Sequence, residues 1–356
     1  MKAIQRFTTP YAQSAVDDLR ERIRRTRWPD AAAASVREIC EYWATDFDWK
    51  AQIEALSRWP HRRFDSAHGG VHFIHVPSVH RSAIPLVLTH GWPGSFLEML
   101  RIIPLLTDSF DLVVPSLPGF GFSDRPTEPG MNAFRIADIW AHLMTELGYA
   151  RFAAQGGDLG AGVSTALGLR HPDRIVGIHL NYIPGSYRPY LKPGELPAPE
   201  ESAFLDDAAR WAERNGAYAH LQATRPLTAA YALNDSPAGL AAWILEKFAE
   251  WSDRGLSRDE LLANVTLYWM TETIHSSFRL YSENRNRPFH FGPDDFVRPP
   301  CAITRFPKEI SAPPRAWVER GYNVRRWTEM PRGGHFAAAE EPELLAADLR
   351  EFFSQI

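Results

Sequence analysis

The sequence predicts an α/β fold: a mostly parallel, doubly wound sheet that follows a helical N-terminal segment and carries a helical insertion. Three observations support this. Strand-like and helix-like patterns alternate over residues 69–182, only helical patterns occur over 183–296, and the alternation resumes over 297–356. Such alternation places parallel strands in one sheet with helices on both faces. We therefore expect a helical segment (1–68), a core in two parts and a helical lid (183–296).

Three helices are expected in the N-terminal segment. Apolar residues recur at helical spacing from residue 16, and a Trp-Pro pair ends this first helix by residue 29. Similar patterns predict helices at about 35–43 and 49–56. The segment is short and rich in tryptophan, so we expect it to pack on the core rather than fold alone.

The first part of the core begins with two predicted strands. Residues 71–76 alternate between apolar and polar, and residues 85–89 form a short apolar run typical of a buried parallel strand. The remaining elements are expected at 95–106 (helix), 111–115 (strand), 133–147 (helix), 151–155 (strand), 161–171 (helix) and 174–181 (strand).

Beyond residue 182 the lid interrupts the alternation with helical patterns that contain many aromatic residues. The second part of the core follows it. Its elements are expected at 302–306 (strand), 314–320 (helix), 323–328 (strand) and 342–353 (helix).

Composition excludes several classes of protein. The chain has 356 residues, 45% of them apolar, and a formal net charge of −4, which does not favour nucleic acid or an anionic membrane surface as a partner. Cys40 and Cys301 are far apart, with no metal-binding or disulfide spacing. No apolar run is long enough to span a membrane, and the first residues lack the apolar core of a signal peptide. We expect a cytoplasmic protein.

Residues 155–162, Gln-Gly-Gly-Asp-Leu-Gly-Ala-Gly, lie between a predicted strand and a predicted helix. A nucleophile elbow needs small residues around a strained turn, and Gly156 and Gly160 supply them. The central residue is Asp158 rather than serine, and a carboxylate suits displacement at an sp³ carbon, with formation of an ester. The alternative is that Asp158 merely caps the following helix.

The α/β-hydrolase fold orders its site as nucleophile, acid, histidine. His335 lies on a glycine-bearing loop between the last strand and the last helix, which makes it the candidate base. Glu309 follows the preceding strand and is the candidate acid, since a general base needs a carboxylate to orient it. Asp294 and Asp295 precede that strand and are weaker candidates. The alternative for Glu309 is an exposed loop carboxylate.

The stretch His90-Gly91-Trp92-Pro93 follows a predicted buried strand. In this fold the loop at that position and the residue after the nucleophile each provide a backbone N–H to the oxyanion hole. This assigns the donors to Trp92 and Leu159. The alternative is a plain turn.

Taken together, these stretches resemble the microsomal type of epoxide hydrolase, in which a helical segment precedes an α/β-hydrolase core. Leu159 stands where the family often has tryptophan, but only its backbone is needed. Membrane-bound relatives carry an N-terminal anchor, and none is expected here. The resemblance rests on residues 27–29 with 46–49, 90–95, 156–160 and 332–338.

The resemblance also implies two lid tyrosines. Tyr218 lies in Gly-Ala-Tyr-Ala-His-Leu-Gln (216–222), and Tyr281 lies in Ser-Phe-Arg-Leu-Tyr-Ser-Glu-Asn (277–284). Two phenols can hydrogen-bond the oxygen of an opening epoxide, and one can donate a proton to it. The family-like stretch 234–240 is expected to be structural.

The expected activity is hydrolysis of an apolar small-molecule epoxide through an ester on Asp158, in detoxification or secondary metabolism. No metal or cofactor is implied, and a homo-oligomer is compatible with the sequence. Two alternatives remain open. A haloalkane or haloacid dehalogenase would share the aspartate but would need N–H donors around a halide, and a ligand-binding protein could retain the fold without catalysis.

Overall fold

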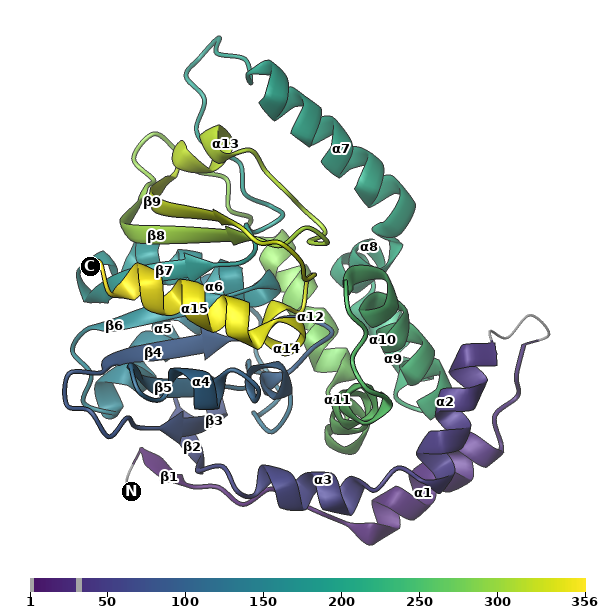
Figure 1. Cartoon of the computed structure of the whole chain (residues 1–356). Coiled ribbons are helices and arrows are strands. Elements are labelled where there is room, and N and C mark those ends of the chain that lie inside the picture. Colours follow the sequence, from purple (N-terminus) through teal and green to yellow (C-terminus); the bar gives the residue numbers. More distant parts are fainter. Residues whose placement is uncertain (1–2, 30–33) are drawn as a thin grey trace.

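The computed structural model describes residues 3–29 and 34–356. Residues 1–2 and 30–33, which belong to the expected N-terminal segment, lie outside the described residues. Over the described part, nine strands form one sheet in the order β1-β2-β3-β5-β4-β6-β7-β8-β9 (Figure 1). Neighbouring strands from β5 through β4, β6, β7 and β8 to β9 are parallel. The pairs β1–β2, β2–β3 and β3–β5 are antiparallel. The mostly parallel sheet is therefore confirmed. The strand bounds are β1 (Ile4–Arg6), β2 (His61–Ser66), β3 (Gly69–Val76), β4 (Ile84–Thr89), β5 (Phe110–Pro115), β6 (Phe152–Gly156), β7 (Ile175–Leu180), β8 (Val297–Arg305) and β9 (Tyr322–Glu329).

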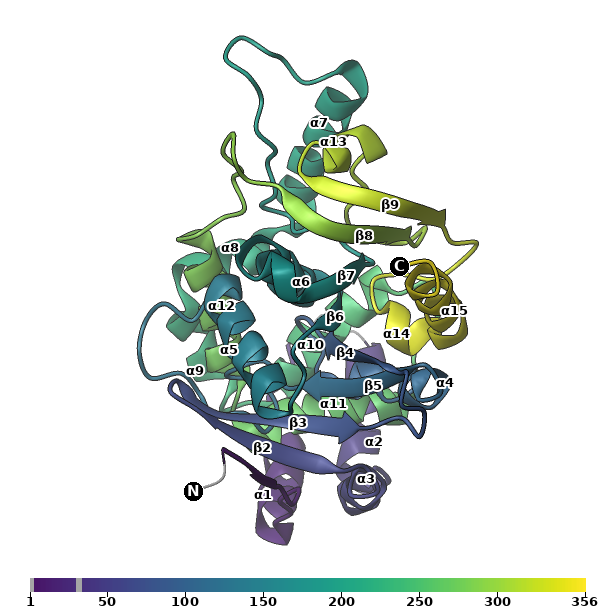
Figure 2. The ribbon, with the colours of Figure 1, turned by 90° about the vertical axis from the view of Figure 1, so that its left-hand side faces the viewer.

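Helices cover both faces of the sheet, as the doubly wound prediction requires. Figure 2 shows α5 and α6 on one face and α4, α14 and α15 on the other. The single helix expected at 95–106 is divided into a 3-10 turn, η1, and the short α4. The side chain of Ser95 accepts a hydrogen bond from the Leu97 amide at the start of η1, and Pro104 lies in the first turn of α4. The bounds are η1 (Phe96–Met99), α4 (Ile103–Leu106), α5 (Ala133–Glu146), α6 (Asp158–Arg170), η2 (Pro172–Arg174), α13 (Arg315–Glu319), α14 (Ala337–Glu340) and α15 (Pro342–Phe353).

The N-terminal segment contains the three expected helices and also two strands that were not expected. Strand β2 has its buried side chains at His61 and Phe64, three residues apart, so it lacks the alternation that predicts a strand. Its conformation is set by pairing with β3, and β1 is set by pairing with β2. The three helices are α1 (Gln13–Arg24), α2 (Ala34–Thr45) and α3 (Trp49–Leu56).

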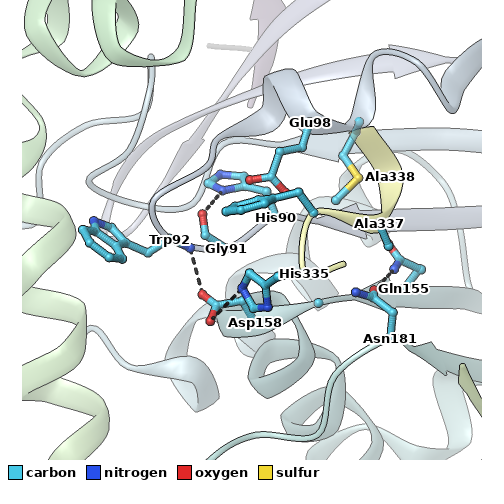
Figure 3. Close-up of a pocket in the computed structure, with 13 residues that line it drawn as sticks. His90, Gly91, Trp92, Glu98, Gln155, Asp158, Asn181, His335, Ala337 and Ala338 are labelled. Carbon is cyan, nitrogen blue, oxygen red and sulfur yellow. Dashed lines mark hydrogen bonds and ion pairs between the residues drawn. The ribbon is translucent and has the colours of Figure 1, made fainter. Parts of the chain in front are cut away.

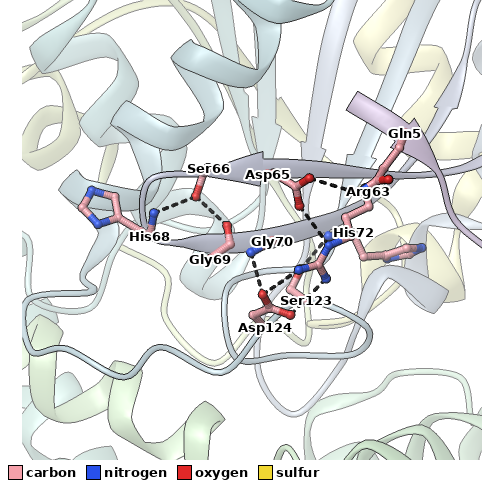
Figure 4. A network of polar contacts seen from close by, with 10 residues as sticks. All are labelled: Gln5, Arg63, Asp65, Ser66, His68, Gly69, Gly70, His72, Ser123 and Asp124. Atoms are coloured by element: carbon pink, nitrogen blue, oxygen red, sulfur yellow. Dashed lines mark hydrogen bonds and ion pairs between the residues drawn. The ribbon is translucent and has the colours of Figure 1, made fainter. Parts of the chain in front are cut away.

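The antiparallel strands are tied to the parallel part of the sheet by a salt bridge and hydrogen bonds (Figure 4). Arg63 on β2 donates to both carboxylate oxygens of Asp124 at 3.0 and 2.7 Å, and the Gly70 amide on β3 donates to Asp124 at 2.7 Å. The hydrogen bonds from Arg63 hold the pKa of Asp124 below its ordinary value. Asp124 lies in the loop after β5, so this contact joins the first strands to the core.

The lid consists of six helices within the described residues, and Figure 1 shows α8 to α12 on one side of the sheet with α1 and α2 beside them. In the buried contact between the N-terminal segment and the lid, Trp43 Nε1 donates to Thr266 Oγ1 at 2.8 Å. Tyr42 and Asp259 make a more exposed hydrogen bond. The N-terminal segment therefore connects the sheet to the lid. The lid bounds are α7 (Pro199–Asn215), α8 (Ala217–Thr224), α9 (Pro226–Leu233), α10 (Pro237–Trp251), α11 (Arg258–Thr271) and α12 (Ile274–Arg285).

A buried carboxylate fixes α15 to three strands of the sheet. Asp348 accepts hydrogen bonds from His179 on β7 at 3.0 Å and from Arg326 and Thr328 on β9 at 2.7 and 2.8 Å, and it also bonds Thr304 on β8. Burial alone would raise the pKa of Asp348, but these hydrogen bonds, led by that of His179, hold it well below its ordinary value. The carboxylate is therefore fully paired although it is only 4% exposed.

None of the helices in the described part of the chain is both long enough and apolar enough to cross a membrane.

Candidate active site

Asp158 lies at a sharp turn between β6 and α6. Its φ is +46°, in the left-handed region that non-glycine residues rarely adopt. A Cβ on Gly156 would lie 2.3 Å from the Gly160 carbonyl oxygen, and a Cβ on Gly160 would lie 2.0 Å from the Thr89 carbonyl oxygen. Both positions therefore require glycine, and the turn has the geometry expected of a nucleophile elbow.

The structure brings Asp158, at the start of α6, together with Glu309 and His335, which lie in the loops after β8 and β9. Figure 3 shows the Asp158 carboxylate next to the His335 ring. His335 Nε2 lies 3.6 Å from Asp158 Oδ2, and His335 Nδ1 lies 2.6 Å from Glu309 Oε1. The helix α6 is capped at Gly157, and the Asp158 side chain faces His335 instead of the helix amides. The side chain of Glu309 is only 4% exposed, whereas Asp294 and Asp295 are exposed.

Two negative partners control the charge of His335. Burial alone would lower the pKa of His335, but the charge of Glu309, the hydrogen bond to it and the nearby charge of Asp158 outweigh burial and hold that pKa well above its ordinary value. In this state the ring is an imidazolium between two carboxylates. Its proton affinity therefore depends on the charge of Asp158.

The lid also contacts the loop that carries His335. The His335 amide donates to the Trp251 carbonyl at 3.0 Å, and the Trp251 ring packs edge-on against the imidazole at a centroid distance of 5.2 Å. Tyr182, just after β7, packs edge-on from another side at 5.8 Å. These contacts fix the ring orientation of His335.

The loop at residues 90–93 presents a backbone donor to Asp158. The Trp92 amide donates to Asp158 Oδ1 at 2.8 Å, and a Cβ on Gly91 would lie 2.4 Å from the Asp158 Cβ. His90 Nε2 accepts from the Leu117 amide at 3.1 Å, while its Nδ1 lies 3.0 Å from the Gly91 carbonyl oxygen. Burial lowers the pKa of His90 to about 4, so the ring is neutral and structural.

Two further residues of this loop and elbow, Pro93 and Leu159, are described by their backbone. Pro93 follows Trp92 through a cis peptide bond. Leu159 follows Asp158 directly in the first turn of α6, and its role as second oxyanion donor stays a prediction.

Tyr218 on α8 and Tyr281 on α12 pack together above the Trp92 ring. Their centroids are 6.1 Å apart, Tyr218 stacks on Trp92 at 5.3 Å, and Tyr281 meets Trp92 edge-on at 5.8 Å. Burial raises the pKa of both phenols, and the charge of Asp158 raises it further. Both hydroxyls are therefore protonated and can act as hydrogen-bond donors.

Sequence reasoning missed several residues of the site. Tyr182 is the second residue after β7, at the edge of the sheet where site residues collect in this fold, and that position could have indicated it. Trp251 ends a lid helix and has no comparable signal. Glu98, Gln155 and Asn181 line a small pocket with Asp158 and are also additions.

Comparison with known proteins gives a consistent result. The family model described as "Epoxide hydrolase N terminus" matches residues 4–99, and that described as "alpha/beta hydrolase fold" matches residues 84–214. A protein of Stigmatella aurantiaca assigned as an epoxide hydrolase is 44% identical, with 98% of this chain and 84% of that protein covered. Epoxide hydrolase 1 of Oryctolagus cuniculus is 38% identical, with 99% and 89% covered.

Two solved structures are similar over almost their whole length. Juvenile hormone epoxide hydrolase from the silkworm Bombyx mori superimposes with a TM-score of 0.87 at 28% identity, covering 100% of this chain and 95% of that one. The epoxide hydrolase of Aspergillus niger gives a TM-score of 0.87 at 29% identity, covering 99% and 96%.

Proposed function

The chain belongs to the epoxide hydrolase family and has the α/β-hydrolase fold, and from this premise we propose that it opens epoxides in two steps through an ester on Asp158. The observation that carries the proposal is the position of the Asp158 carboxylate. One of its oxygens accepts from the Trp92 amide, and the other faces a histidine that is itself paired with Glu309. The dehalogenase and ligand-binding alternatives are not favoured by the family.

In the first step, Asp158 Oδ2 attacks an epoxide carbon and the carbon–oxygen bond of the ring breaks. Tyr218 and Tyr281 hydrogen-bond the departing oxygen, and one of them gives it a proton. The raised pKa of both phenols keeps that proton available at neutral pH. The product of this step is a neutral ester of Asp158.

In the second step, His335 takes a proton from water, and the hydroxide oxygen adds to the carbonyl carbon of the ester. Esterification removes the charge of Asp158, which is one of the two charges that raise the pKa of His335. The pKa of the imidazole therefore falls when it has to act as a base. The Trp92 amide, with Leu159 as the second donor, stabilises the oxyanion. Collapse of this intermediate breaks the ester C–O bond, and the His335 imidazolium protonates the departing oxygen, which releases the diol. The carboxylic acid left on Asp158 returns a proton to the phenolate formed in the first step.

The identity of the nucleophile is tested with heavy-oxygen water under single-turnover conditions, with enzyme in excess. If Asp158 attacks carbon, the diol carries an oxygen from Asp158 and emerges largely unlabelled, while the peptide containing Asp158 gains the label. A labelled diol with an unlabelled enzyme would show direct attack by water and would overturn the covalent scheme.

The finer substrate class is an apolar epoxide. Four aromatic rings around the expected position of the epoxide support this: those of Trp92, Tyr218, Trp251 and Tyr281. The test compares kcat/KM for alkyl and aryl epoxides with kcat/KM for charged epoxides. Equal values for the two groups would contradict the assignment of an apolar substrate. The cytoplasmic location and a homo-oligomeric state stay predictions from the sequence.

A further inference from the structure

A small pocket lies beside Asp158, on a side that the lid tyrosines do not reach. Its volume is about 10 Å³, close to the roughly 10–15 Å³ that one water molecule needs. Of the described residues that line it, none is a tyrosine. We call this space the water chamber; its polar lining side chains are His90, Glu98, Gln155, Asp158, Asn181 and His335.

Two of the residues that line the chamber each have a buried polar atom without a partner. Glu98 Oε1 and Gln155 Oε1 are both buried, and neither has a hydrogen bond within the described part of the chain. The amide nitrogen of Gln155 is already used, since it donates to Asn181 Oδ1 at 2.9 Å. Buried polar atoms without a protein partner are usually satisfied by ordered water. The chamber therefore has both the size and the unpaired groups of a site for one water molecule.

Glu98 is placed to act as a donor in this chamber. Burial raises its pKa to about 8; Asp158 raises it and His335 lowers it. At neutral pH the carboxyl group is therefore mostly protonated and carries an O–H. Once the ester on Asp158 has formed and the His335 ring is neutral, a water molecule that accepts from Glu98 can donate to Gln155 Oε1 and to His335 Nε2, which gives the three hydrogen bonds typical of buried water.

Gly94 leaves the space that this carboxyl group occupies. A Cβ on Gly94 would lie 1.1 Å from Glu98 Oε1, and its three nearest neighbours would all be atoms of the Glu98 side chain. The Glu98 carboxyl group can therefore take this position only because residue 94 has no side chain.

We propose that the water chamber holds the hydrolytic water and that Glu98, with Gln155, positions this water for His335. Glu98 is then a positioning residue for the second step, and water reaches the ester from a different side than the epoxide. This inference rests on the proposed two-step function.

The test separates the two steps in single-turnover experiments, with rapid quenching and intact mass to follow the ester on Asp158. Glu98→Ala should slow decay of the ester by about 10- to 100-fold, the effect expected when a reacting group is misplaced. Formation of the ester should stay within about 3-fold, since it uses no water. Glu98→Gln should recover most of the lost rate, because its amide can donate in the same place. Glu54→Gln, at an exposed site on α3, is the matched control and should change neither step.

A second variant, Gly94→Ala, disturbs the Glu98 carboxyl group without changing Glu98 itself. Gly94→Ala should displace the Glu98 carboxyl group and slow ester decay, and the double variant with Glu98→Ala should be no slower than the slower single variant. Unchanged ester decay in Glu98→Ala, equal slowing of both steps, or additive effects in the double variant would each overturn the role of Glu98. Failure of the parent enzyme to form any ester would instead overturn the proposed function.

Discussion

Asp158 lies at the turn from β6 into α6, and Glu309 and His335 lie on the loops that follow β8 and β9, whereas Tyr218 and Tyr281 lie within helices of the lid. The first three meet because the carboxyl ends of parallel strands share one edge, so strand pairing fixes their separations. The two tyrosines meet Trp92 only through the packing of α8 and α12. The core thus supplies unique groups in fixed positions, and the lid supplies a pair of similar groups.

The largest effect is expected from His335→Gln in the core. The variant keeps the Asp158 carboxylate and both phenols, so it can form the ester, but it has no base for water. Ester decay should fall by about 10³-fold, and the adduct should accumulate on intact mass. If excess reactive epoxide leaves no adduct while turnover is lost, the two steps do not depend on different groups as argued.

Substitutions in the lid should show that its two phenols are partly redundant. Tyr218→Phe or Tyr281→Phe should slow ester formation by about 10-fold, and the double variant by about 10³-fold, since one remaining hydroxyl can still donate. Ester decay should be unaffected in each single variant. A single variant as inactive as the double variant would show that the two phenols are not equivalent, and it would contradict the view that the lid supplies a redundant pair.

A smaller effect on turnover is expected from Trp43→Phe, which removes the buried hydrogen bond to Thr266 on α11. The loss should cost about 1 kcal/mol of stability from the hydrogen bond, with some further loss of packing. Turnover should fall only a few-fold, because the substitution loosens the lid but leaves the catalytic residues unchanged. Tyr42→Phe, which removes the neighbouring exposed hydrogen bond to Asp259, is the control, and an equal loss of turnover there would contradict this account.

The smallest effect on turnover is expected from Asp348→Asn, because this residue lies in the sheet–α15 contact and not in the site. Thermal or urea unfolding at pH 7 should show a loss of about 3 kcal/mol, as for a broken buried ion pair. The pKa of Asp348 is depressed in the folded protein. Its stabilising contribution is therefore present above its unfolded pKa and is lost as the pH falls through the folded pKa. The gap between parent and variant should narrow on acidification below about pH 4, and a gap that widens there would contradict the assignment.

The same contrast between core and lid separates what the sequence could predict from what it could not. The alternating pattern predicted the sheet, and strand order singled out Asp158, Glu309 and His335 for positions that the structure brings together. Tyr218 and Tyr281 have no signal of their own, since a helical tyrosine that packs on aromatic rings looks like a core residue; only the resemblance indicated them.

The elements and residues that were missed depend on distant partners. The strand β2 has no alternating pattern, and its pairing with β3 decides its conformation. Glu98 falls in a 3-10 turn after the 90–95 stretch, where a sequence pattern cannot reveal that its carboxyl group occupies the space left by Gly94. Long-range packing of this kind leaves no trace in local periodicity.

The N-terminal segment touches both the sheet and the lid, and this limits how the molecule can be recombined. Its strands pair with the sheet edge, while Trp43 and Tyr42 on α2 bond residues of the lid. A chimera that imports residues 183–296 from a relative would bring a lid whose outer surface does not match the resident α2. Lid and N-terminal segment should therefore be transplanted as a unit, and relatives that exchange substrate preference by exchanging lids would have to inherit both pieces together.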